Sequence, residues 1–197
     1  MLILFCEHKK EVFVKILVAG GSKSGKSSLA QSLSSALCRD GLFYLATMAP
    51  CDEEDRQRVA RHQSERSGLG FITLEKPVAI DECLSDLTAQ STVLIDSLTA
   101  LLANEMFGGG VDIKAWERAQ NGVSQICGGV LNTVIVTDDI FCGAEINDPT
   151  TEMFLRGLGH LNRGAADLCD IVVEMSFGTA VFLKGERLFD SLCKKIV

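Results

Sequence analysis

The stretch GGSKSGKS at residues 20–27 constrains the fold of this 197-residue chain more than any other feature. An apolar run, VFVKILVAG, leads into it, and residues 26–38 then place leucine and alanine at helical spacing. The stretch follows the pattern G-x-x-x-x-G-K-[ST], in which a glycine-rich loop joins a strand to a helix. Its fixed positions are Gly20, Gly25, Lys26 and Ser27.

Such a loop binds phosphate because its backbone N–H groups and the helix N-terminus carry partial positive charge. We predict that Lys26 reaches the β- and γ-phosphates of a nucleotide and that Ser27 offers its hydroxyl to Mg²⁺. A glycine- and serine-rich turn that binds nothing is the alternative. The predicted nucleotide contacts in the loop are Gly20, Gly21, Ser22, Lys23, Ser24, Gly25, Lys26 and Ser27.

The rest of the chain alternates β-branched apolar runs with helical patterns. Such alternation favours an α/β fold with a mostly parallel sheet covered by helices on both faces. Ligands of these sheets bind beyond the carboxyl ends of the strands. We predict strands at 12–20, 42–48, 71–75, 92–98 and 133–139, and a C-terminal hairpin at 171–176 and 180–185. Helices are predicted at 26–38, 52–66, around 80–87, from 98 to 107, at 112–127 and at 149–168, with a loop at 140–148.

Length and charge narrow the class of protein. The chain suits one domain, 12–197, preceded by an N-terminal extension, 1–11. A formal net charge of −7 argues against nucleic acid as the main partner. The sequence has no run of 18 apolar residues, the length that a membrane-spanning helix needs. Its eight cysteines include no Cys-x-x-Cys pair. We therefore expect a cytoplasmic protein.

Acidic residues at strand ends are candidates for the metal. VLIDS places Asp96 at the end of an apolar strand, where a phosphate-loop enzyme holds Mg²⁺. TVIVTDD offers Asp138 and Asp139 at the end of another strand, for a role near the metal or the acceptor. Any of them could instead cap the following helix. We predict Asp96 as the metal partner of Ser27.

The segment DEEDRQRVARHQSER at 52–66 is almost entirely charged or polar. Arg58, His62 and Arg66 are spaced by four, which places them on one helical face. A solvated helix with an ordinary surface histidine is one interpretation. The other is a phosphorus nucleophile, with guanidinium groups that stabilise the transferring phosphate.

The ordered set of motifs resembles a known family. YLATMAPCDEEDRQRVARHQSER (44–66), the loop GGSKSGKS and VLIDSLTALLANEMF (93–107) are similar to the adenosylcobinamide kinase/adenosylcobinamide-phosphate guanylyltransferases of cobalamin biosynthesis. The resemblance covers roughly residues 14–185. It implies a RecA-like P-loop NTPase fold and a homotrimer.

The resemblance also implies two reactions. The first phosphorylates the aminopropanol hydroxyl of adenosylcobinamide with ATP or GTP. The second takes GMP from GTP onto a histidine and passes it to the phosphorylated cobinamide, giving adenosylcobinamide-GDP. His62 matches that histidine. The resemblance implies further nucleotide contacts at Ala46, Thr47, Met48, Gln63, Ser64, Glu65, Arg66, Glu75 and Asp96.

The chain departs from the family pattern at Ser67, at Asp138-Asp139 (where Asn-Glu is usual), at Glu145-Ile146 and at Asn162-Arg163. Two rival functions stay open from the residues. One is a P-loop kinase of another small alcohol, with His62 idle. The other is a nucleotide-binding protein without enzymatic activity.

Overall fold

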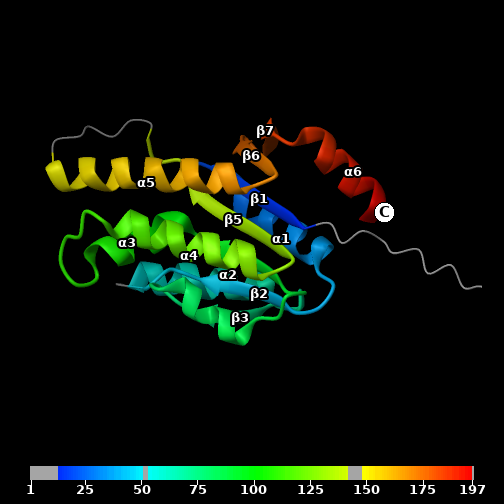
Figure 1. Ribbon diagram of the computed structural model, residues 1–197, viewed down its shortest axis with the longest axis horizontal. Helices are drawn as coiled ribbons and strands as arrows, with labels where there is room; N and C mark the ends of the chain where they lie inside the picture. Colours follow the sequence, from blue (N-terminus) through cyan, green and yellow to red (C-terminus); the bar gives the residue numbers. More distant parts are fainter. Residues whose placement is uncertain (1–12, 51–52, 142–147, 197) are drawn as a thin grey trace, which may run out of the picture.

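A computed structural model describes residues 13–50, 53–141 and 148–196 (Figure 1). The predicted N-terminal extension, the first residue of the predicted helix 52–66 and most of the predicted loop 140–148 lie outside the described residues. The strands are β1 Val14–Gly20, β2 Leu42–Ala46, β3 Ile72–Glu75, β4 Thr92–Asp96, β5 Asn132–Asp138, β6 Ile171–Ser176 and β7 Thr179–Lys184. The helices are α1 Lys26–Leu37, α2 Glu53–Arg66, η1 Ile80–Asp86, α3 Leu98–Phe107, α4 Ala115–Gly129, α5 Pro149–Leu168 and α6 Glu186–Ile196.

In the described part of the chain, seven strands form one sheet in the order β3-β2-β4-β5-β1-β6-β7. Every neighbouring pair is parallel except β6 and β7, which form the predicted antiparallel hairpin. The phosphate loop follows β1, a central strand. The predicted RecA-like α/β fold is confirmed.

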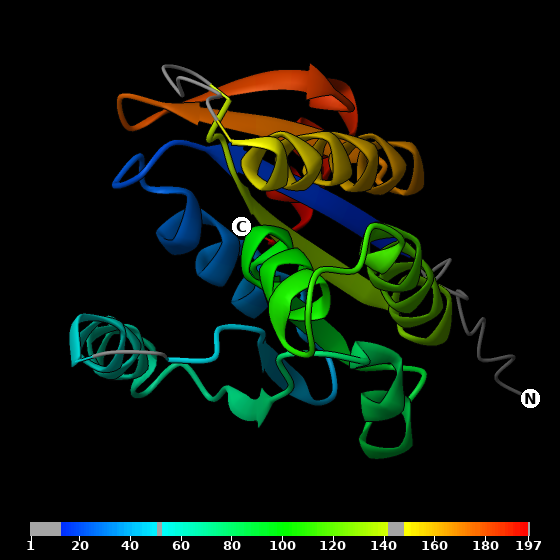
Figure 2. The same ribbon diagram turned by 90° about the vertical axis from the view of Figure 1, so that its left-hand side faces the viewer.

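Each face of the sheet has its own apolar core, because successive side chains of a strand point to opposite faces. Leu17, Leu45 and Ile135 face α3, α4 and α5. Ile16, Leu94 and Val134 face α1 and α6. Figure 2 shows α3, α4 and α5 on one side of the sheet and α1 on the other.

Strand order decides which acidic residue lies beside the phosphate loop. In the parallel ladder, Gly20 at the end of β1 is level with Asp138 at the end of β5. Asp96 ends β4, on the far side of β5, and is level with Ala46 of β2. The two carboxylates therefore occupy neighbouring strand ends, with Asp138 nearer to the loop.

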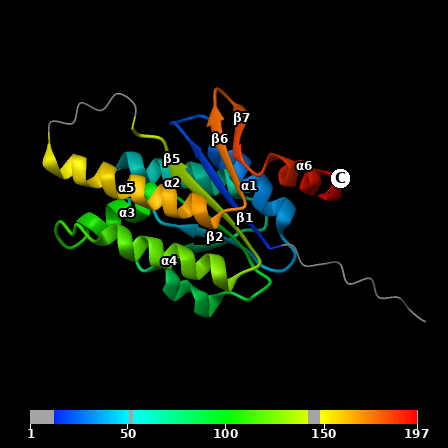
Figure 3. The same cartoon turned by 45° about the horizontal axis from the view of Figure 1, so that its top comes forward.

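Two elements differ from the sequence prediction. The segment around 80–87 is a 3-10 helix, η1, and ends at Asp86. The sequence analysis also missed α6, which follows the hairpin and packs Leu188, Phe189 and Leu192 onto the α1 face of the sheet. Figure 3 shows α6 next to β6 and β7. None of the helices in the described residues is long and apolar enough to cross a membrane.

Val59 and Ala60 are the two apolar residues of helix α2, which are too few to form an apolar face that could be buried against the sheet. Figure 2 shows it beyond β2 and β3, apart from the helices that cover the sheet. It ends as predicted at Arg66, where Gly68 adopts a φ of 90° and the Leu69 N–H donates to the Arg66 carbonyl.

Candidate active site

A cavity of about 310 Å³ opens at the carboxyl ends of the strands, where the fold class predicts a ligand. It extends from the phosphate loop to helix α2. Residues from β2, β3, β4, β5 and four helices contribute to its wall. Its lining comprises Lys26, Ser27, Tyr44, Ala46, Met48, Pro50, Val59, Gln63, Arg66, Thr73, Glu75, Asp96, Ser97, Thr99, Ala100, Ala103, Asp138 and Phe154.

Two glycines of the phosphate loop are required by its shape. Gly25 caps α1 with a φ of 94°, a left-handed conformation that a side chain disfavours. A Cβ atom at Gly20 would lie 2.7 Å from the carbonyl oxygen of Met175 on β6. The loop can therefore pass closely over the end of the sheet and turn directly into α1.

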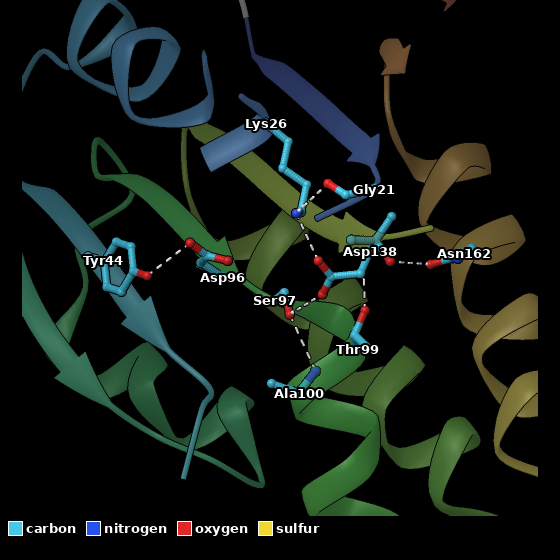
Figure 4. Close-up of polar contacts among 10 residues, drawn as sticks. Gly21, Lys26, Tyr44, Asp96, Ser97, Thr99, Ala100, Asp138 and Asn162 are labelled. Atoms are coloured by element: carbon cyan, nitrogen blue, oxygen red, sulfur yellow. Dashed lines mark hydrogen bonds and ion pairs between the residues drawn. The ribbon is translucent and has the colours of Figure 1, made fainter. Parts of the chain in front are cut away.

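Lys26 is held at the bottom of the cavity (Figure 4). Its side chain is almost wholly buried, and Nζ donates to the Gly21 carbonyl at 3.1 Å. Nζ also lies 2.9 Å from Oδ1 of Asp138. The lysine of the loop thus pairs with the acid of β5, not with Asp96.

Asp138 joins the phosphate loop to the start of α3. Its backbone N–H donates to Thr99 Oγ1 at 3.0 Å. Its second carboxylate oxygen, Oδ2, accepts from Ser97 Oγ at 3.4 Å. Ser97 is the N-cap of α3, because its Oγ accepts from the Ala100 N–H. Figure 4 shows Lys26 and Ser97 meeting the Asp138 carboxylate, and Thr99 next to the Asp138 backbone.

Asp96 lies in the same cavity wall and accepts a hydrogen bond from the Tyr44 hydroxyl at 2.9 Å. Asp139, the other residue of the Asp138-Asp139 pair, is exposed and caps its own turn by accepting from the Phe141 N–H. It is not among the residues that line the cavity in the described structure.

Thr47 was predicted to contact nucleotide, but its side chain is fully buried and lies behind the cavity wall. Its hydroxyl donates to the Ser97 carbonyl at 2.8 Å and accepts from the Ser97 N–H at 2.7 Å. Its own carbonyl accepts from Asn104 at 2.6 Å. Thr47 therefore holds the β4–α3 junction, where the Asp96–Ser97 peptide bond is cis.

Helix α2 contributes Val59, Gln63 and Arg66 to the cavity. Arg66 is 7% exposed, and its guanidinium carbon lies 3.4 Å from the centre of the Tyr44 ring. Its Nη1 atom is buried and has no hydrogen-bond partner among the described residues. A buried guanidinium nitrogen without a partner suits an anion that enters the cavity, because desolvating it unpaired is unfavourable.

The side chains of Arg58, His62 and Glu65 lie outside the described structure, although their backbone belongs to α2. On a helix, position 62 neighbours position 59, three residues earlier, and position 66, four residues later. Val59 and Arg66 line the cavity. Position 62 is therefore next along the helix to two positions of the cavity wall.

Of the predicted residues, the structure brings together Lys26, Ser27, Ala46, Met48, Gln63, Arg66, Glu75 and Asp96 in the cavity lining. Ser64 is exposed and lies outside this lining. The sequence analysis missed Tyr44, Thr73, Thr99 and Phe154 as members of the wall. Tyr44 belongs to the segment 44–66 that resembles the family, so the sequence offered a signal for it. Phe154 belongs to no motif, and only the packing of α5 in the fold brings it to the cavity.

Other reactive groups in the described residues are outside the cavity. His160 is exposed and stacks on Trp116 with ring centres 4.7 Å apart. Burial raises the pKa of the Cys127 and Cys169 thiols, which keeps them protonated and poorly nucleophilic. The stacked histidine and the two buried thiols therefore supply no nucleophile to the cavity.

Comparison with known proteins identifies the family. The profile described as CobU, cobinamide kinase / cobinamide phosphate guanyltransferase, matches residues 16–183. A bifunctional adenosylcobalamin biosynthesis protein CobP of Pseudomonas aeruginosa is 29% identical over 176 residues, covering 87% of this chain and 98% of that protein. A bifunctional adenosylcobalamin biosynthesis protein CobU of Salmonella typhimurium is 28% identical over 182 residues, covering 86% of this chain and 99% of that protein.

Among solved structures, a Pyrococcus horikoshii protein superposes with a TM-score of 0.52 at 10% identity, covering 89% of this chain and 88% of that chain. At this identity the likeness concerns the fold alone.

Proposed function

Since the chain belongs to the cobinamide kinase / cobinamide phosphate guanyltransferase family of enzymes, we propose that it performs both reactions of that family in one cavity. It phosphorylates adenosylcobinamide with a nucleoside triphosphate. It then transfers GMP from GTP, through a histidine, to adenosylcobinamide phosphate. The product is adenosylcobinamide-GDP, an intermediate of cobalamin nucleotide-loop assembly.

One observation carries this proposal: a single cavity is lined by Lys26 and Ser27 of the phosphate loop and by Gln63 and Arg66 of α2. A plain phosphate-loop kinase has no need of a histidine nucleophile beside its nucleotide site, because phosphoryl transfer proceeds without one. Here the helix that carries His62 borders the same space as the loop.

In the phosphoryl transfer, the loop N–H groups and Lys26 balance the charge of the β- and γ-phosphates. The acceptor hydroxyl attacks the γ-phosphorus, and a nucleoside diphosphate leaves. This step is positioning and electrostatics, so it needs no nucleophile from the protein.

In the guanylyl transfer, a nitrogen of His62 attacks the α-phosphorus of GTP and pyrophosphate leaves. A P–N bond forms, and the phosphate of adenosylcobinamide phosphate later breaks it. The proposed role of Arg66 is to stabilise the charge on the transferring phosphate, and its burial and the unbonded Nη1 among the described residues support this role.

The oxygens in the cavity suit Mg²⁺. Ser27 and Asp96 present a hydroxyl and a carboxylate to the same space, and such hard oxygen donors are the ligands that Mg²⁺ prefers. The described residues contain no cluster of three histidine, cysteine or acidic side chains in ligand positions. A magnesium ion that arrives with nucleotide needs one or two protein oxygens besides the phosphates. When bound, it would neutralise developing charge on the phosphates.

The predicted homotrimer and cytoplasmic location belong to this proposal as well. Both follow from the resemblance and from the composition, and both stay predictions.

Intact mass measurement tests the proposal. The protein is incubated with GTP and Mg²⁺ and should gain the mass of GMP, with pyrophosphate released. The bond should be labile in acid and stable in base, as a P–N bond is. His62→Asn should abolish the adduct, whereas His160→Asn, which alters an exposed histidine outside the cavity, should keep it.

The rival functions give different results. A plain kinase would phosphorylate an alcohol and show no adduct. A nucleotide-binding protein without activity would bind GTP and release neither pyrophosphate nor a phosphorylated corrinoid. Either result would overturn the two-reaction proposal.

A further inference from the structure

The phosphate-loop end of the cavity holds a carboxylate that the two reactions, as described so far, do not use. Asp138 lies 2.9 Å from Nζ of Lys26, on the strand next to β1. Because Lys26 is the residue that meets the β- and γ-phosphates, a group in contact with its ammonium lies beside the phosphoryl group to be transferred.

The geometry points to Asp138 as the general base of the phosphoryl transfer, accepting the proton of the acceptor hydroxyl. This inference rests on the proposed kinase activity. The hydroxyl oxygen bonds to the γ-phosphorus, and the bond from that phosphorus to the bridging oxygen breaks. The hydroxyl proton passes to a carboxylate oxygen of Asp138, and the nucleoside diphosphate leaves with the bonding electron pair.

The two oxygens of this carboxylate are in different situations. Oδ1 pairs with Lys26, whereas the contact of Oδ2 with Ser97 Oγ is long, at 3.4 Å. A hydrogen bond of that length between hydroxyl and carboxylate is weak. Oδ2 is thus the oxygen that can exchange its partner for a substrate hydroxyl in the cavity.

The backbone of Asp138 is fixed although its outer oxygen is weakly held. Its N–H donates to Thr99 Oγ1, and the preceding residue, Thr137, donates through its hydroxyl to Asn162 Oδ1 at 2.8 Å (Figure 4). These bonds tie the end of β5 to α3 and to α5. A general base needs such fixed placement, because the proton transfer depends on hydrogen-bond reach.

The neighbouring carboxylates fit the role less well. Asp96 accepts from Tyr44 and lies one strand farther from the phosphate loop. Asp139 is exposed and outside the cavity lining as described. Glu75 lines the cavity at the end of β3, the sheet edge farthest from β1 on that side.

A base for the kinase step has no part in the proposed guanylyl transfer, because the attacking group there is His62, a residue of α2, which borders the other end of the cavity. Asp138→Asn keeps the size of the side chain and one acceptor oxygen, which can still meet the Lys26 ammonium, but it cannot accept the proton. It should lower phosphoryl transfer to adenosylcobinamide by about 10²–10⁴-fold. Formation of the GMP adduct from GTP should persist.

Two further readouts separate a base from a residue that merely holds Lys26. In the wild type, the rate of phosphoryl transfer should rise with pH and then level off, and in Asp138→Asn this rise should disappear. GTP affinity, measured by titration without acceptor, should not fall in the variant. Asp139→Asn, the matched control outside the cavity, should retain the wild-type rate and pH profile.

Three results would overturn the inference: phosphoryl transfer at the wild-type rate in Asp138→Asn, an unchanged pH profile, or an equal loss of both reactions. The last would mean that Asp138 acts through the position of Lys26. A wild-type protein that does not phosphorylate adenosylcobinamide at all would instead refute the proposed function, before any variant is made.

Discussion

The two ends of the cavity are built in opposite ways. At the phosphate end, Lys26 is almost wholly buried and bonded to Gly21 and Asp138, and the surrounding strands belong to the apolar core. At the other end, α2 is mostly polar and contributes an exposed Gln63. The buried contact of this helix with β2 is the stacking of Arg66 on Tyr44.

The difference teaches which part of such a site a sequence can reveal. At the phosphate end, the strand-loop-helix geometry determines which residues fit, so they follow a motif with fixed spacing. At the α2 end, the proposed reaction and not core packing would determine the residues, so the segment looks like any charged helix. Arg66 connects the ends, because it packs on the β2 tyrosine that also donates to Asp96.

The largest expected effect is at the phosphate end. Lys26→Ala removes the cation that we propose meets the β- and γ-phosphates, and both reactions should fall by at least about 10²–10³-fold, as when one charge-stabilising donor is lost. The fold should persist, as circular dichroism can check. Lys114→Ala, at an exposed position, is the matched control. If either reaction kept its wild-type rate in Lys26→Ala, that reaction would not depend on the phosphate end of the cavity, and the prediction would be wrong.

Asp96 should come next. Asp96→Asn removes a charged oxygen ligand, and because a bound metal is worth several kcal/mol, activity at limiting Mg²⁺ should fall by about 10–100-fold. Added Mg²⁺ should restore part of it in a titration of rate against Mg²⁺. An unchanged rate at limiting Mg²⁺ would leave Asp96 as the acceptor of the Tyr44 hydroxyl and no more.

The smallest effect should be at Arg66, and the two reactions should lose unequal amounts of activity. Arg66→Ala removes a cation–π contact worth about 0.5–2 kcal/mol, or roughly 3–30-fold, from the attachment of α2. Formation of the GMP adduct should fall by this factor or more, while phosphoryl transfer changes less. Arg156→Ala removes an exposed arginine paired with Glu152 and serves as the control. Equal losses of both reactions would contradict a separate role for the α2 end.

Much of the fold could be predicted, because hydrophobic runs and helical spacing identified the sheet strands and the helix Pro149–Leu168 at its observed bounds. Helix α6 was missed although ERLFDSLCKKI is strongly amphipathic as a helix, with Leu188, Phe189 and Leu192 on the face that packs onto the sheet. The sequence carried this signal. The segment around 80–87 has apolar spacing compatible with either helix type, and it is a 3-10 helix.

The pairing of Lys26 with Asp138 could not be predicted from the motifs. VLIDS and TVIVTDD both read as strands that end in acid. Which acid meets the lysine depends on β5 lying between β1 and β4, and strand order is set by tertiary packing. Thr47 shows the same limit, since the family resemblance implied a nucleotide contact there, while its hydroxyl is bonded to the Ser97 backbone.

The central claim is that one cavity serves both reactions from its two ends, and competition tests it most directly. The α,β-methylene analogue of GTP can donate its γ-phosphoryl group but cannot release GMP. In the presence of GTP, it should block formation of the GMP adduct at the same concentrations at which it supports phosphoryl transfer. Adduct formation that continues unchanged while the analogue saturates phosphoryl transfer would show two separate nucleotide sites and contradict the account.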